Sequence, residues 1–228
     1  MSTTPMEWSE FQNNAENTKA VRKTLGAVLA LAPEDAPVPD SLVSADGRQV
    51  VALPETYWPV GLLTPEGISH EREVETGAVD ALGHFSPVRE DIESATRRVT
   101  FRGYELHRKN ILAISEGLDP ASMPDVTAHQ ARIELPDRPL QRFYRAIAIS
   151  FDGNLEEPWF DGVFYPRLSV TSFPSDAWTR GDARSYEIGM TAYKDPVLGY
   201  DKAVTYAGVG FSKNAAALGW TVTDPAGD

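Results

Sequence analysis

The sequence predicts a mainly β (α+β) fold, an antiparallel β-sandwich or partly rolled barrel with one flanking helix. Several segments alternate between apolar and polar residues, one segment has helical spacing, and Pro and Gly punctuate the rest of the chain. Alternation with one solvated face is typical of antiparallel sheets rather than of buried parallel ones. The 228 residues, 42% of them hydrophobic, are enough for one domain with a sizeable core.

The clearest strand pattern lies at 184–192, where four apolar residues alternate with four small or polar ones. The two sets are Tyr186, Ile188, Met190 and Ala192 against Ser185, Glu187, Gly189 and Thr191. Residues 97–104 and 143–151 alternate with the same period of two. Weaker strand patterns lie at 57–63, 68–75, 129–135 and 166–172. The apolar run 25–32 is expected to be a buried first strand.

One segment has the spacing of a helix. Its apolar face has intervals of 3, 4, 3 and 4 residues and consists of Tyr104, His107, Ile111, Ile114 and Leu118. Gly117 is well placed to end this helix, and Pro120 cannot continue it. We expect His107 to be a histidine at the core or its rim rather than a functional group.

The two ends of the chain are expected to differ from a central domain at 20–212. Residues 1–19 are predicted to form a flexible arm, and 213–228 a tail to which no role is assigned. Lys19, Arg22 and Lys23 precede the apolar run as in an export signal, but about twenty mostly polar residues come first. The run is also much shorter than the roughly 20 residues that a bilayer requires, so no membrane partner is expected.

Segment 66–95 stands out by its charge. It contains eight acidic residues and two arginines, which gives it half of the chain's net charge of −12. A basic stretch, 97–109, follows directly. A connection of this length is longer than an ordinary hairpin turn, so we expect a long acidic loop with a function, the alternative being a solvated loop that aids solubility.

No pattern in the sequence indicates a specific reaction. The absence of Cys excludes disulfides, thiolate metal sites and a Cys nucleophile, and the net charge argues against a protein that grips nucleic acid. His70 and His84, with Glu71 and Glu73 nearby, are only a weak metal pattern. Residues 156–161 are better interpreted as an exposed loop with a Trp anchor than as a carboxylate pair. We therefore expect a structural protein with no enzymatic activity, cofactor or metal.

Five segments follow one another in a recognisable order: AVRKTLGAVLA at 20–30, YWPVGLL at 57–63, RRVTFRGYE at 97–105, FYPRLSV at 164–170 and YEIGMTAY at 186–193. This ordered set resembles the major tail protein of long-tailed siphophages, in particular those of actinobacteria. The resemblance covers roughly 20–212. It rests on the order of these segments, on the size of the chain and on the sequences of the predicted strands, not on a catalytic motif.

The resemblance implies a tail-tube-like fold in a virion protein that is assembled in the host cytoplasm. Six copies would form a ring, and stacked rings would form the tube through which DNA passes without being held. Tape measure, terminator and baseplate proteins would be further partners. The long loop would reach the next ring, which makes 66–95 the candidate loop and 1–19 a second contact arm.

Charge and alternation then nominate individual residues. An acidic-to-basic contact between rings would use Glu71, Glu73, Glu75, Arg97 and Arg102. Glu187 is the candidate lumen-lining residue, because the polar face of 184–192 carries an acid and no base. Two other classes stay open: a related virion component such as a tail terminator or baseplate hub, and a cellular β-sandwich binding module or hydrolase.

Overall fold

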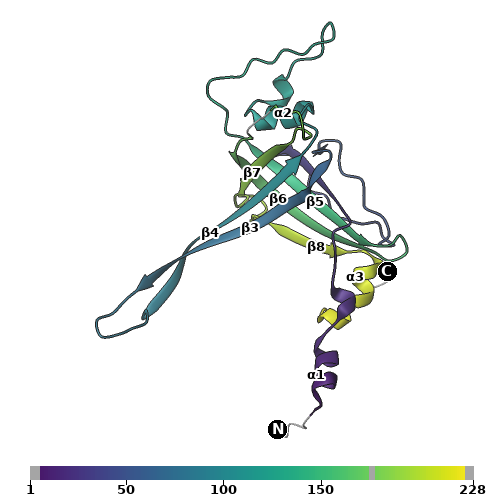
Figure 1. Cartoon of the computed structure of the whole chain (residues 1–228), viewed down its shortest axis with the longest axis vertical. Helices are drawn as coiled ribbons and strands as arrows, with labels where there is room; N and C mark the ends of the chain where they lie inside the picture. Colours follow the sequence, from purple (N-terminus) through teal and green to yellow (C-terminus); the bar gives the residue numbers. More distant parts are fainter. Residues whose placement is uncertain (1–5, 175–177, 224–228) are drawn as a thin grey trace.

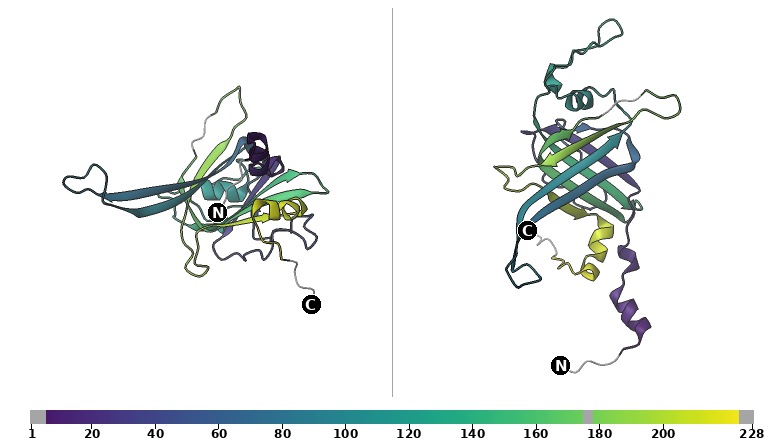
Figure 2. Two further views of the ribbon diagram at one scale, coloured as in Figure 1. Left: turned by 90° about the horizontal axis from the view of Figure 1, so that it is seen from below. Right: turned by 60° about the vertical axis from the view of Figure 1, so that its left-hand side comes forward.

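The computed structural model describes residues 6–174 and 178–223, and these are organised around one antiparallel sheet (Figure 1). The strands follow the order β2-β1-β5-β6-β7-β4-β3, and β8 pairs with β6. Their bounds are β1 Gly26–Pro33, β2 Trp58–Pro59, β3 Leu63–Val79, β4 Arg89–Gly103, β5 Phe143–Gly153, β6 Pro158–Ser172, β7 Tyr186–Ala192 and β8 Ala203–Ala207. The predicted mainly β, antiparallel class is confirmed. Of the two architectures expected, the described residues form the single, partly rolled sheet (Figure 2).

The main core lies on the inner face of the rolled sheet. Side chains from β1, β4, β5, β6 and β7 meet there, and helix α2 (Lys109–Ser115) contributes Ile111 and Ile114. The alternation predicted for β7 is confirmed, because Ile188 and Met190 are fully buried while Glu187 is exposed. Residues of opposite parity on this strand therefore lie on opposite faces of the sheet.

A second apolar cluster covers the other face of β1, β5 and β6. Ile147, Phe160 and Phe164 on the strands pack against residues of the returning segment 34–57, among them Leu42 and Tyr57. β5 and β6 are therefore buried on both faces, whereas the sequence indicated one solvated face. The first strand, β1, is buried over Leu29–Ala32, as expected for the apolar run 25–32. Gly162 permits this packing, since a Cβ there would lie 2.7 Å from Leu42 Cδ2.

The predicted helix at 104–118 is wrong in its first turn. Its residues 104–108 form a turn instead, because Tyr104 N donates to Leu62 O and Leu62 N donates to Glu105 Oε1. These bonds hold the segment beside the start of β3, and His107 is exposed there. Gly117 ends the helix region as predicted, with φ at +66°.

Segment 129–135, predicted as a weak strand, is an irregular part of the connection between α2 and β5. A single bridge joins Thr127 to Gln130 around a tight turn. Ala128 and His129 take positive φ angles of 48° and 67° in this turn. Among the described residues, segment 129–135 has no neighbouring strand to pair with and no core to cover, so its alternating apolar residues do not form a strand.

Segment 66–95 is not the long loop that we expected. It forms most of a β-hairpin, in which β3 and β4 pair from Leu63–Gly103 out to Val79–Arg89. Alternating charged and β-branched residues pair well across two strands, so the connecting loop is short. The hairpin extends well beyond the rest of the sheet (Figures 1 and 2).

Both ends of the chain contain helical turns. In the predicted arm 1–19, helix α1 (Trp8–Ala15) and a 3₁₀ turn, η1 (Thr18–Ala20), project away from the sheet (Figure 1). The predicted tail begins in α3 (Val209–Asn214) and η3 (Ala216–Leu218), and η2 (Pro120–Ser122) follows α2. Residues 1–5 and 224–228 of these two segments lie outside the described residues.

No helix in the described ranges is both long and apolar enough to cross a bilayer.

We expect adjacent substitutions on β7 to differ sharply in their cost. Ile188→Ala empties a fully buried position and lowers the free energy of unfolding by about 2–5 kcal/mol. Glu187→Ala, one residue away on the exposed face, is the matched control and changes it by no more than about 0.5 kcal/mol. Urea unfolding measures both, and equal costs would contradict the assigned faces.

Candidate assembly interface

The outer face of the hairpin and of β7 brings together most of the residues nominated from the sequence. In the strand register Glu71 lies opposite Arg98, Glu73 opposite Thr96, and Arg102 opposite Glu187. Directly opposed residues share a face of the sheet, so Glu71, Glu73, Glu75, Arg102 and Glu187 lie on one surface. We call this surface the outer face.

The polar contacts on the outer face, an ion pair and a hydrogen bond among them, are exposed. Arg98 Nη2 lies 3.5 Å from Glu73 Oε2, and both side chains are more than half exposed. Arg102 Nε donates to Ser185 Oγ at 3.0 Å. Exposed pairs of this kind contribute little to stability, on the order of 0–1 kcal/mol, and are screened by salt. These charges are therefore available to a partner at small cost to the fold.

Arg97 does not belong to the outer face. It points to the opposite side of β4, where its Nε lies 3.0 Å from Asp201 Oδ2. Nearby, His70 Nδ1 is hydrogen-bonded to Tyr165 Oη at 2.9 Å, and Lys202 Nζ lies 5.7 Å from the centre of the Tyr165 ring. We call these five residues the hinge cluster, because they join the base of the hairpin to β6 and to the segment before β8.

Partial burial shifts the pKa values of His70, Tyr165 and Lys202 in the hinge cluster. It lowers the pKa of His70, and the positive charge of Lys202 lowers it further. Burial raises the pKa of Tyr165 to about 12 and lowers the pKa of Lys202. The sequence analysis did not predict this cluster. His70 is two residues from Ile68 in the alternating segment 68–75, so the alternation would have placed it on the same, inward face as Ile68.

The weak metal pattern is not brought together. His70 belongs to the hinge cluster, Glu71 and Glu73 lie on the outer face, and His84 is in the turn at the far end of the hairpin. Within residues 6–174 and 178–223, no three His, Asp or Glu side chains converge as metal ligands would.

The segment 156–161 is also different from the prediction. Trp159 is 5% exposed, so it is not an anchor for a second protein. Its Nε1 donates to Asp161 Oδ1 at 3.0 Å, the Arg22 guanidinium lies over its ring, and Phe211 packs edge-on against it. Glu157 forms an ion pair with Lys213. The Trp thus fastens the chain ends to the sheet.

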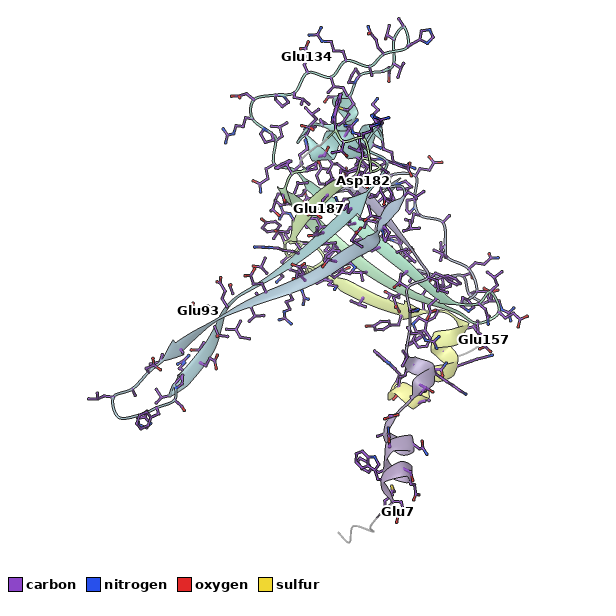
Figure 3. All side chains as sticks on the ribbon, in the orientation of Figure 1. Glu7, Glu93, Glu134, Glu157, Asp182 and Glu187 are labelled. Atoms are coloured by element: carbon purple, nitrogen blue, oxygen red, sulfur yellow. The ribbon has the colours of Figure 1, made fainter. Side chains whose placement is uncertain are left out.

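The two projections carry exposed apolar side chains that the sequence analysis overlooked. At the end of the hairpin, Leu82 and Phe85 are completely exposed. On α1, Trp8 and Phe11 are 73% and 55% exposed and stack on each other at 5.9 Å. The acidic residues of 66–95 dominated its interpretation and concealed these two apolar positions. Figure 3 shows Glu93 on the hairpin and Glu7 on the N-terminal arm, both far from Glu187 on the sheet.

The sheet also ends in strands that have a partner on one side only. β3 lies at the end of the strand order and pairs with β4 alone, and β8 pairs with β6 alone. Unpaired backbone groups along such edges are a template for another strand. The 17 residues of β3 make its edge long for a protein that stays alone.

Comparisons with known proteins give distant structural similarities. No family model and no curated protein matches the chain. Among solved structures, one chain of the tail of an empty gene transfer agent particle with C6 symmetry is 10% identical, with 66% of this chain and 86% of that chain covered and a TM-score of 0.35. A chain of a native gene transfer agent virion is 11% identical over 68% and 91%, again with a TM-score of 0.35.

We expect His70 to titrate below its usual pKa of about 6.5 in an NMR titration. Lys202→Met removes a neighbouring positive charge, so it raises the pKa of His70 while burial keeps it below that value. Lys109→Met, on α2, is the control and leaves it unchanged. A His70 that titrates normally and ignores Lys202 would contradict the hinge cluster.

Proposed function

We propose that this chain is a structural subunit of a phage-like virion tail, the major tail tube protein, which forms hexameric rings that stack into a conduit for DNA. The proposal makes it a non-enzymatic protein of the virion. The observation that carries it is that two segments, the hairpin and α1, project from the sheet away from the α2 end of the molecule (Figure 1). Both carry large apolar side chains that are mostly exposed to solvent. The resemblance of segments over 20–212 to siphophage major tail proteins supports the same class.

Within a ring, the open strand edges are the surfaces that a neighbouring copy would complete. Pairing of the β3 edge with a strand of the next copy would satisfy its free backbone groups and continue the sheet around the ring. The outer face of β7 would then line the bore. It exposes Glu187 beside small and hydroxyl residues, and Arg102 on β4 lies directly opposite Glu187. The carboxylate and the guanidinium offset each other, so this surface would bind phosphate only weakly.

Between rings, the hairpin is the contact that we propose. It carries Glu71, Glu73 and Glu75 away from the body, and Arg102 lies on the same face nearer to the α2 end. A contact between these acids and Arg102 of the next copy would fix the register of stacking. Arg97, which the hinge cluster holds, is no longer part of the proposed contact.

A tail terminator or baseplate hub is the second candidate in the same class. A terminator would also form rings but would stop after one layer, whereas a tube subunit repeats the same head-to-tail contact without closure. A binding module would instead use a pocket. A cavity of about 530 Å³ near the start of α2 is lined by Glu34, Asp35 and Asp119. Glu34 and Asp119 are already paired, with Arg167 and Arg142, and Asp35 is exposed.

The test is light scattering with negative-stain microscopy of the purified protein over a series of concentrations and salt. We expect hollow rods of stacked rings that shorten as salt rises. Replacing Glu71, Glu73 and Glu75 together by Lys is expected to stop stacking and leave the fold intact, since the three side chains are exposed. The triple Gln variant is the matched control and weakens stacking less. Single rings alone would favour the terminator, and a monomer under all conditions would contradict self-assembly.

A further inference from the structure

The hairpin ends in a small apolar surface. It consists of Val79, Leu82, Phe85 and Val88, and we call it the hairpin tip; Leu82 and Phe85 have 105% and 109% relative exposure. The turn is closed by hydrogen bonds from Val88 N to Val79 O at 2.9 Å and from His84 N to Ala81 O at 3.1 Å. A defined turn that presents two uncovered large side chains is typical of a contact surface rather than of a solubilising loop.

The acidic strands behind the tip, residues 66–79 and 89–95, which we call the shaft, limit the kind of surface that the tip can contact. Segment 66–95 has a net charge of −6, so an acidic protein surface or an anionic membrane would repel it. A suitable site is apolar, offers hydrogen-bond donors to the turn and has no carboxylate.

The opposite end of the same chain has such a site. A cavity of about 190 Å³ beside α2, which we call the α2 cavity, has Leu140 and Phe173 in its lining, and these side chains are 56% and 45% exposed. Its other lining residues include Ile114, Pro139 and Val170, and none of them is Asp or Glu. The site is therefore apolar and lacks negative charge.

Two polar atoms in the lining of the α2 cavity have no partner in the described chain. Arg142 Nε and Ser169 Oγ are buried and form no hydrogen bond, although Arg142 Nη2 donates to Asp119 at 2.9 Å. A buried donor without an acceptor costs free energy, so it favours a ligand that supplies one. Backbone carbonyl oxygens of a turn are acceptors of this kind.

The tip cannot reach the α2 cavity of its own chain. The hairpin projects from the end of the sheet that is opposite to α2 (Figures 1 and 2). A second copy placed head to tail brings the two surfaces together, and the contact then repeats from copy to copy.

We propose that the hairpin tip of one copy docks in the α2 cavity of a second copy. Leu82 and Phe85 pack against Leu140 and Phe173, and carbonyl oxygens of the turn accept hydrogen bonds from Arg142 Nε and Ser169 Oγ. This inference rests on the proposed function and deepens it, because it gives the stacking contact an apolar anchor in addition to the charges of the shaft.

Cross-linking tests the pairing, because the natural chain has no Cys. Phe85→Cys and Leu140→Cys are made as separate variants, mixed under assembly conditions and oxidised. We expect a covalent dimer only in the mixture, and a ladder of multimers from the double variant. Val197→Cys, at a position that is 88% exposed in the segment after β7, replaces Leu140→Cys as the control and gives no product with Phe85→Cys.

The remaining outcomes overturn the proposal in distinguishable ways. Rods that form without a cross-link, or with equal cross-linking to Val197→Cys, overturn the docking site and leave the proposed function standing. A dimer of Phe85→Cys with itself would mean that tips meet each other. A chain that neither assembles nor cross-links overturns both proposals.

Removing the apolar side chains of the tip tests the docking contact without cross-linking. Leu82→Ser with Phe85→Ser changes only exposed side chains, so the fold is expected to be unchanged by circular dichroism, while the concentration required for stacking rises at least tenfold. Leu155→Ser, at a position that is 87% exposed in the turn between β5 and β6, is the matched control and leaves stacking unchanged. Unaltered stacking of the double variant would overturn the anchor.

Discussion

Only the base of the β3–β4 hairpin packs against the core, and the rest of the hairpin projects beyond it. The surfaces that this projection leaves uncovered are the ones that the proposed contacts between copies use. At the base of the hairpin, Val99 and Phe101 are buried against α2 and the rolled sheet. Beyond the hinge cluster, the strands have each other but no third layer. Isolated two-stranded hairpins are marginally stable in water, so a hairpin of this length gains from a surface supplied by another molecule.

The body of the protein is built to hold that hairpin in a fixed direction. Arg97 and His70 connect the two strands of the hairpin to Asp201 and Tyr165. β7 pairs with the edge of β4 opposite to β3 and so continues the sheet. The second apolar cluster, under segment 34–57, buries the other face of β1, β5 and β6. A rigid base with exposed ends is the arrangement that a repeating contact between copies requires, since a mobile arm would lose more conformational entropy on docking.

Period-two alternation was sufficient to predict β7 and the base of β4, because each has one buried and one solvated face. It also placed Glu187 correctly on the exposed face. It could not show that β5 and β6 are buried twice, since that depends on where 34–57 returns. The same limit explains the hairpin: segment 66–95 was interpreted by its charge, whereas its structure follows from pairing with residues 89–103. Arg97 and Arg102 differ by five positions on one strand, so the same alternation already places them on opposite faces. They were nominated together by charge, and that choice overlooked the alternation.

Hydrogen–deuterium exchange of the free and the assembled protein tests most directly whether copies complete these surfaces. Amides of residues 69–95 exchange rapidly in the free chain and become strongly protected on assembly, while those of β5, already buried in the sheet, change little. Assembly that leaves the hairpin as exchangeable as in the free chain would contradict the central role given to it.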